Sequence, residues 1–118
     1  MLKLKVITQN TARIIEINGE VDMYSSPEVR EVLLQMVDIK APTIILDFRN
    51  VVYIDSSGIA TLVEALQEVE KYNGKFILAN LSKNVLDVFE LSRLDKVFDI
   101  YNSLEEALKS SNLYGNHK

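Results

Sequence analysis

The sequence predicts an α/β fold: a mixed, mostly parallel sheet of about five strands, with an N-terminal β-hairpin and about four helices. Two observations indicate this class. Residues 2–8 and 12–18 alternate between apolar and polar side chains and are joined by a short polar turn, which is typical of an antiparallel hairpin. Beyond them, short apolar runs alternate with segments of helical period, which is typical of parallel strands joined by crossover helices.

Capping residues mark where the first and last helices begin. Ser25 precedes Pro27 and stands three residues before Glu28, which is the spacing of a capping box with proline in the first turn. Ser103 repeats the capping-box spacing with Glu106. We therefore expect one helix to begin at Ser25 and another at Ser103.

Apolar periodicity predicts the elements between these two helices. The run 43–48 is nearly all apolar and predicts a central strand that is buried on both faces. Asn73 and Gly74 predict a left-handed cap at the end of the next helix. The other expected elements are that helix, which follows Gly58, a strand at 76–79, a helix at 82–91 and a strand at 97–101.

The length of 118 residues fits a single domain that can bury a core without disulfides or metals. We assign residues 1–112 to this domain and expect residues 113–118 to fray. No run of some 18 apolar residues occurs, so we expect no membrane insertion, and the N-terminal segment lacks the apolar core of a signal peptide. These features predict a cytoplasmic protein.

Composition excludes several classes of function. The net charge is −4 and no cluster of Lys and Arg occurs, so we expect no direct contact with nucleic acid. The chain has no Cys and a single histidine, His117, which excludes a thiolate metal site, a cysteine nucleophile and a three-histidine zinc site. We expect no metal and no cofactor.

The run 53–59 places two hydroxyls where the central strand gives way to a helix. Asp55 and Ser56 are both good N-cap residues, because their oxygens accept from the unpaired N–H groups of the first turn. Gly58 in that turn lowers helix stability by about 1 kcal/mol relative to Ala. A glycine at this position is explained if a partner's backbone or side chain must approach closely there. A helix N-terminus also attracts anions, so a phosphate on Ser56 would fit without melting the helix.

Two questions stay open at this run. Most serines at helix starts only cap the helix, and Ser57 has the same chemistry as Ser56 one residue further on. Asp22 follows the second expected strand, so it could lie beside Asp55 at the carboxyl ends of the strands, where sites gather in such sheets. Asp22 and Asp55 either cap a turn and a helix or take part in recognition.

Three ordered segments carry a family resemblance: Gly19–Asp22, Asp55–Gly58 and Leu91–Phe98. Together they resemble the STAS family and, within it, the bacterial anti-sigma factor antagonists. The resemblance runs from about Leu2 to Leu108 and implies the STAS fold. It also implies that Ser56 is the phosphorylated residue, with Ser57 as the alternative, and that Asp22, Asp55, Ser56, Ser57 and Gly58 contact the partner.

The function implied by the resemblance is a partner switch. The unphosphorylated antagonist binds an anti-sigma factor that is also a serine kinase, and a sigma factor is released. The kinase then phosphorylates the antagonist, and a serine phosphatase of the metal-dependent type removes the phosphate. ATP and magnesium would belong to the kinase, and the protein itself would not be an enzyme.

Three alternatives remain. Similar domains are interaction subunits of transporters or of stress-signalling assemblies that phosphorylation does not switch. A phosphoaspartate receiver is a second alternative because Asp47 ends the central strand, although a receiver does not begin with a hairpin. Nucleophilic catalysis is the weakest alternative, since Ser56 has no histidine near it in sequence and lies outside a G-x-S-x-G motif.

Overall fold

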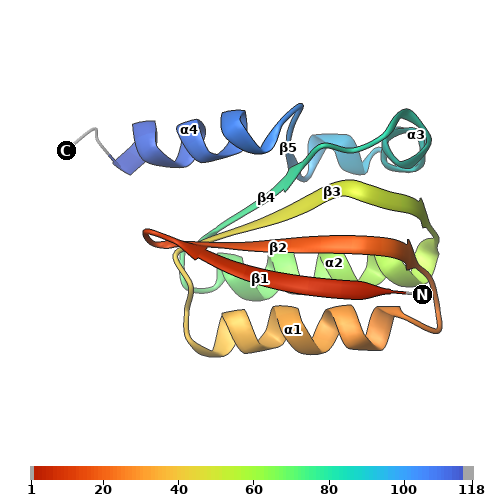
Figure 1. The fold of residues 1–118 in the computed structure, drawn as a ribbon, viewed down its shortest axis with the longest axis horizontal. Coiled ribbons are helices and arrows are strands. Elements are labelled where there is room, and N and C mark those ends of the chain that lie inside the picture. The colour runs from red at the N-terminus through yellow and green to blue at the C-terminus, as the bar shows by residue number, and fades with distance from the viewer. Residues whose placement is uncertain (1, 116–118) are drawn as a thin grey trace.

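The structure is a computed structural model that describes residues 2–115, and it forms a five-stranded sheet covered by helices (Figure 1). The predicted α/β class, the N-terminal hairpin and the four helices are confirmed. In chain order the elements are β1 (Lys3–Gln9), β2 (Ala12–Val21), α1 (Ser26–Asp38), β3 (Thr43–Ile54), α2 (Ser56–Glu70), β4 (Lys75–Ala79), α3 (Lys83–Leu91), the 3₁₀ turn η1 (Leu94–Lys96), β5 (Asp99–Tyr101) and α4 (Leu104–Gly115).

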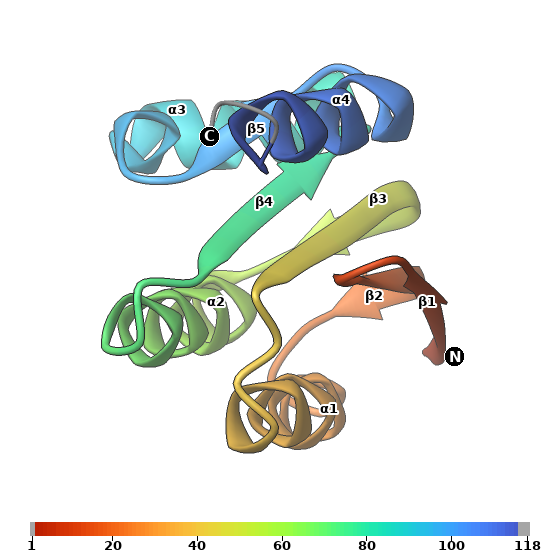
Figure 2. The same cartoon turned by 90° about the vertical axis from the view of Figure 1, so that its left-hand side faces the viewer.

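The strands lie in the sheet in chain order, β1-β2-β3-β4-β5. The β1–β2 hairpin is antiparallel and the remaining pairs are parallel. Helices α1 and α2 lie side by side on one face and α4 lies on the other (Figure 2). Helix α3 lies at the end of the sheet where β2 and β3 finish (Figure 1).

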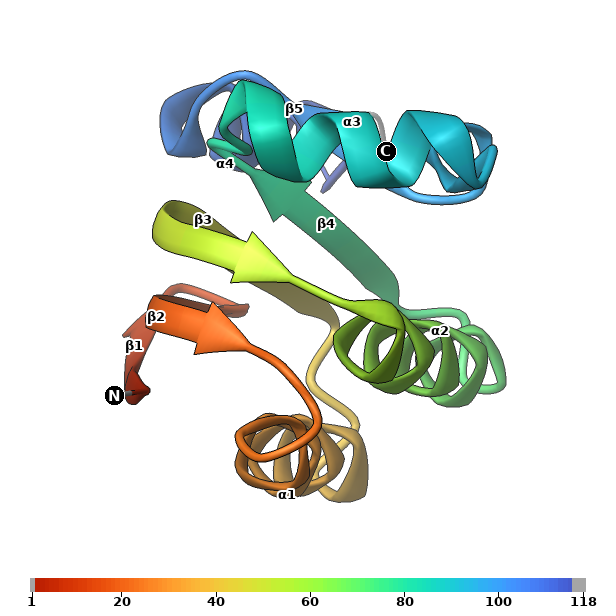
Figure 3. The ribbon, with the colours of Figure 1, turned by 90° about the vertical axis from the view of Figure 1, so that its right-hand side faces the viewer.

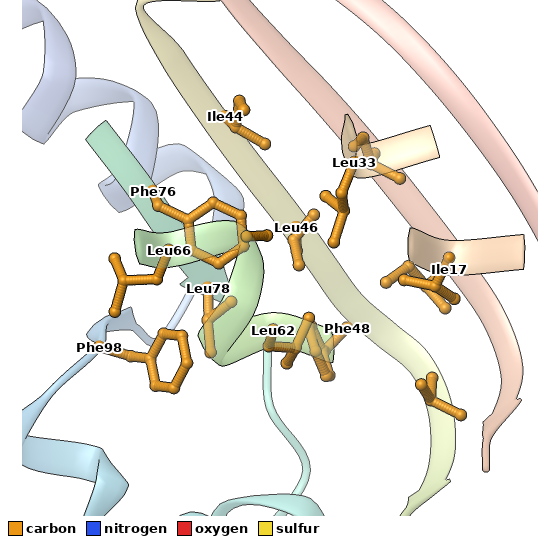
Figure 4. Packing of buried hydrophobic residues seen from close by; sticks show 14 of the residues in the cluster. Ile17, Leu33, Ile44, Leu46, Phe48, Leu62, Leu66, Phe76, Leu78 and Phe98 are labelled. Carbon is orange, nitrogen blue, oxygen red and sulfur yellow. The ribbon is translucent and has the colours of Figure 1, made fainter. Parts of the chain in front are cut away.

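Alternate residues of the strands build two apolar layers, as expected for strands buried on both faces. The larger layer lies between the sheet and helices α1, α2 and α3 (Figure 4). Its members include Ile17, Leu33, Ile44, Leu46, Phe48, Leu62, Leu66, Phe76, Leu78 and Phe98. The smaller layer lies under α4 and is formed by Ala12, Ile14, Ile45, Ile77, Ala79 and Ala107.

Two strands are longer than the sequence predicts. β2 continues past residue 18 to Val21, and β3 continues past residue 48 to Ile54. Polar residues in these extensions interrupt the apolar pattern by which a strand is predicted. The register between β2 and β3 also shifts twice along this stretch, which breaks the alternation of buried and exposed side chains. As a result Val52 and Tyr53 are both exposed although they are consecutive strand residues.

The predicted capping box at Ser25 does not form. Ser25 has a helical backbone, and its hydroxyl donates to the carbonyl oxygen of Glu20 and accepts from the N–H of Asp22. The hydroxyl is therefore used to close the preceding loop. The second predicted cap is confirmed, because the hydroxyl of Ser103 accepts from the N–H of Glu106 over 3.1 Å.

The C-terminal third of the chain differs from the prediction in detail. The last strand begins at Asp99 and not at residue 97, since the N–H groups of Val97 and Phe98 donate to the carbonyl oxygen of Leu94 in η1. The backbone of α4 is helical to Gly115. The fraying expected for 113–118 stays a prediction, and residues 116–118, His117 among them, lie outside the described residues.

Candidate functional site

The predicted site residues meet where β2 and β3 end. Val21 and Ile54 are register partners in the parallel pair, so Asp22 and Asp55 follow at the same edge of the sheet. The N–H of Asp55 also donates to the carbonyl oxygen of Val21 over 3.1 Å. Figure 3 faces this end of the molecule, where α1 and α2 both begin. The expectation that Asp22 lies beside the loop of Ser56 is confirmed.

Asp55 is the N-cap of α2, one of the two caps expected from the sequence. Its Oδ1 accepts from the N–H groups of Ser57, over 2.9 Å, and Gly58, over 3.2 Å. An extended backbone at Asp55 aims the carboxylate back at these groups. The anion site at this helix N-terminus is therefore already occupied by a carboxylate, and a phosphate on Ser56 would find fewer free N–H groups than the sequence suggests.

The two adjacent serines differ in exposure. Ser56 is exposed and Ser57 is half-buried. Within the described part of the chain, the hydroxyl of Ser56 has no hydrogen-bond partner in the structure. Of the two hydroxyls, the one on Ser56 is thus the one presented to an enzyme that approaches from solvent.

Gly58 is buried and lies close to two strands of the same chain. A Cβ at this position would lie 2.7 Å from the carbonyl oxygen of Val21, 2.8 Å from Val21 Cγ1 and 2.7 Å from Ile54 Cγ1. Side-chain carbon atoms do not approach that closely without displacement of the neighbours. The close approach that Gly58 permits is therefore made by β2 and β3 of the same chain, and contact between Gly58 and a partner stays a prediction.

Asp22 organises the loop between β2 and α1. Its Oδ1 accepts from the N–H groups of Tyr24, over 2.9 Å, and Ser25, over 3.0 Å, and from the hydroxyl of Ser25, over 3.3 Å. These bonds hold the pKa of the Asp22 carboxyl below its ordinary value. The bond from the N–H of Ser25 lowers the pKa most. The turn-capping interpretation of Asp22 is thus confirmed as a structural fact.

An apolar hollow adjoins Ser56. It is lined by Ser56, Ile59, Val88, Leu91 and Ser92, so α2 and α3 both contribute. Leu91 is 86% exposed at the end of α3. Sequence reasoning missed Val88 and Leu91 as neighbours of Ser56. The signal that could have drawn attention to them is Leu91 itself, a large apolar residue between Glu90 and Ser92 in a segment that carries the family resemblance.

Asp47, the phosphate acceptor in the alternative of a receiver domain, is buried. It is 6% exposed, and its Oδ1 accepts from the side-chain amide of Asn80 and from the N–H of Arg49, both over 3.0 Å. The bond between Asp47 and Asn80 thus connects the loop after β4 to strand β3. Among the described residues, no three His, Cys, Asp or Glu side chains are grouped so that they could hold a metal ion, and no helix is long and apolar enough to cross a membrane.

The sequence-family model of the STAS domain matches residues 3–107 of this chain. The chain belongs to the STAS domain family. The match covers the whole sheet, all of the first three helices and the beginning of α4. The family predicted from the three sequence segments is thereby confirmed.

Similar STAS proteins include regulators of sigma factors. The anti-sigma-B factor antagonist of Bacillus subtilis is 34% identical over 86 residues, which cover 73% of this chain and 78% of that protein. The Bacillus protein SpoIIAA, solved in its phosphorylated form, has a TM-score of 0.72 and 26% identity and covers 94% of this chain and 99% of its own. An anti-sigma factor antagonist from Mycobacterium paratuberculosis has a TM-score of 0.87 and 23% identity, with 93% of each chain covered, and shows the same fold.

Proposed function

We propose that this STAS domain is an anti-sigma factor antagonist that phosphorylation of Ser56 switches off. In the unphosphorylated form it binds an anti-sigma factor that is also a serine kinase, and a sigma factor is thereby released. The kinase phosphorylates Ser56, and a serine phosphatase of the metal-dependent type reverses the modification. The observation that carries the proposal is an exposed serine hydroxyl, without an internal hydrogen bond, at the rim of an apolar hollow.

The geometry favours Ser56 over Ser57 as the phosphorylated residue. A kinase must reach the hydroxyl and hold it against the γ-phosphate of ATP, which requires an accessible side chain. Ser56 is exposed, whereas Ser57 is half-buried and directs its N–H to Asp55. The difference in exposure supports the assignment that the family resemblance implies.

A phosphate on Ser56 would act electrostatically. It adds a charge of about −1.5 to −2 beside an apolar hollow that carries no cation in its lining. Two N–H groups of the first turn of α2, those of Ser57 and Gly58, already bond to the Asp55 carboxylate. A partner that covers the hollow must then desolvate an unpaired dianion, and a penalty of about 3 to 4 kcal/mol weakens binding roughly 100- to 1,000-fold.

Asp22, Asp55 and Gly58 support recognition through the shape of the site. Asp22 closes one loop, Asp55 begins the helix that carries Ser56, and Gly58 lets that helix lie against Val21. We propose that these three residues fix the surface that the partner contacts. Their direct contact with the partner, implied by the resemblance, stays a prediction.

The test is incubation with purified serine kinases of the anti-sigma class from the same genome, with ATP and magnesium, followed by intact mass and site mapping. We expect one phosphate, on Ser56, and loss of kinase binding after modification. Stable complex formation with a transporter or a signalling scaffold, with no phosphate incorporated by any kinase, would instead support the alternative of an interaction subunit.

A further inference from the structure

The loop between β2 and α1 presents two large side chains to solvent. Met23 is 62% exposed and Tyr24 is 86% exposed. Neither belongs to the core or to the hollow beside Ser56. Both lie in the described part of the chain on a loop of four residues whose other members, Asp22 and Ser25, are used for internal hydrogen bonds.

The loop is held in place by several bonds. The Asp22 carboxylate accepts from the N–H groups of Tyr24 and Ser25, and the Ser25 hydroxyl bridges the N–H of Asp22 and the carbonyl oxygen of Glu20. The carbonyl oxygen of Asp22 also accepts from the N–H of Ser26 over 2.8 Å. The backbone under Met23 and Tyr24 is therefore fixed before any partner arrives, which lowers the entropy cost of binding.

This loop and the N-terminus of α2 are joined at Val21. Val21 immediately precedes the loop, and its carbonyl oxygen accepts from Asp55 and lies against Gly58. Met23 and Tyr24 are thus anchored to the same edge of the sheet as Ser56. A partner that covers both Ser56 and the end of β2 therefore lies next to the loop that carries these two side chains.

Charge around Tyr24 indicates what kind of surface fits there. Tyr24 lines a shallow hollow with Leu2, Glu20, Asp22, Ser25 and Glu28. Three of these six residues are acidic and none is basic. Aromatic side chains that are rigid and ringed by complementary charge are typical anchors of protein interfaces.

We propose that Met23 and Tyr24 are a second anchor for the serine kinase partner, received by an apolar socket that basic side chains surround. This inference rests on the proposed function and extends its contact surface from the hollow at Ser56 to the β2–α1 loop. The tyrosine ring supplies the apolar contact, and Glu20 and Glu28 attract the basic side chains.

The experiment measures the affinity of five variants for the purified kinase that phosphorylates Ser56. We expect Tyr24→Ala to weaken the affinity for the kinase at least about tenfold. The affinity of Tyr24→Phe should stay within about threefold of that of the wild-type chain. Ile39→Ala is the matched control, because Ile39 is 56% exposed at the far end of α1. Leu91→Ala probes the hollow itself. Glu28→Gln is expected to reduce the dependence of affinity on salt concentration.

The outcomes separate the two proposals. If Leu91→Ala weakens binding and Tyr24→Ala behaves like Ile39→Ala, the second anchor is wrong and the proposed function stands. If no kinase binds or phosphorylates the unmodified chain, the proposed function itself fails. Thermal unfolding of each variant checks the fold, and a raised KM with unchanged kcat for phosphorylation of Tyr24→Ala would show a lost contact in a correctly folded protein.

Discussion

The backbone N–H of Asp55 donates to the carbonyl oxygen of Val21 over 3.1 Å, and this bond joins the two loops of the site. Asp55 begins the helix that carries Ser56, and Val21 ends the strand that leads into the loop of Asp22 and Tyr24. Because both loops leave the same edge of the sheet, a change in one is expected to be felt at the other.

Replacement of Ser56 by Asp is expected to weaken kinase binding while the thermal midpoint stays near that of the unmodified protein. The exposed side chain makes no internal bond among the described residues, so a charge there costs the fold little. Affinity by calorimetry and thermal unfolding by circular dichroism measure the two effects. Ser57→Ala is the matched control and should still accept phosphate at Ser56; a large drop in the midpoint of Ser56→Asp would show that Ser56 is structural.

Replacement of Asp55 by Ala is expected to lower the free energy of unfolding by about 0.5–2 kcal/mol, because the N–H groups of Ser57 and Gly58 lose their acceptor. Asp55→Asn keeps an acceptor oxygen and should lose far less. Urea unfolding measures both variants. Equal losses for Ala and Asn would mean that the charge, and not the hydrogen bonds, stabilises the start of α2.

Replacement of Gly58 by Ala is expected to destabilise the protein by about 1–3 kcal/mol, even though Ala favours helix by about 1 kcal/mol over Gly. The added methyl would meet Val21 and Ile54 at 2.7–2.8 Å, and one of its neighbours is backbone. Gln67→Ala, at an exposed position of α2, serves as the control and should be near neutral. A stabilised Gly58→Ala protein would contradict the close packing of α2 on β2.

The loop of Asp22 is expected to loosen in acid. The pKa of the Asp22 carboxyl is lowered in the folded protein, first by the N–H of Ser25, so the charged carboxylate stabilises the loop. That contribution is complete above the ordinary aspartate pKa of about 4 and is lost as the pH falls through the lowered folded value. The amide NMR shifts of Tyr24 and Ser25 should therefore move only below about pH 4.

A matched pair of substitutions tests the same loop without a change of pH. Asp22→Asn keeps an oxygen that can accept from Tyr24 and Ser25, whereas Asp22→Ala removes it. If Asp22 acts by shaping the loop, Asn preserves kinase affinity and Ala reduces it. Loss of affinity in both variants would show that the negative charge itself contacts the partner.

The sequence by itself determined the α/β class, the hairpin and the approximate position of every α-helix, and it narrowed the cap of α2 to Asp55 or Ser56. These features depend on local periodicity and on residues close in the chain, so the pattern carries them directly. It also indicated that Asp22 could lie beside Asp55, because the ends of neighbouring parallel strands share an edge, and the register of β2 with β3 placed it there.

Only the tertiary structure decided the rest. Gly58 is buried against Val21, Ser56 is exposed while Ser57 is half-buried, and Leu91 lines the same hollow as Ser56. These relations depend on the register of β2 with β3 and on the packing of α3, which join residues far apart in the chain. The register shifts twice in this region, and a shift reorients side chains without leaving a local sequence pattern. For that reason the sequence predicted the helix that carries the serine but not the surface around it.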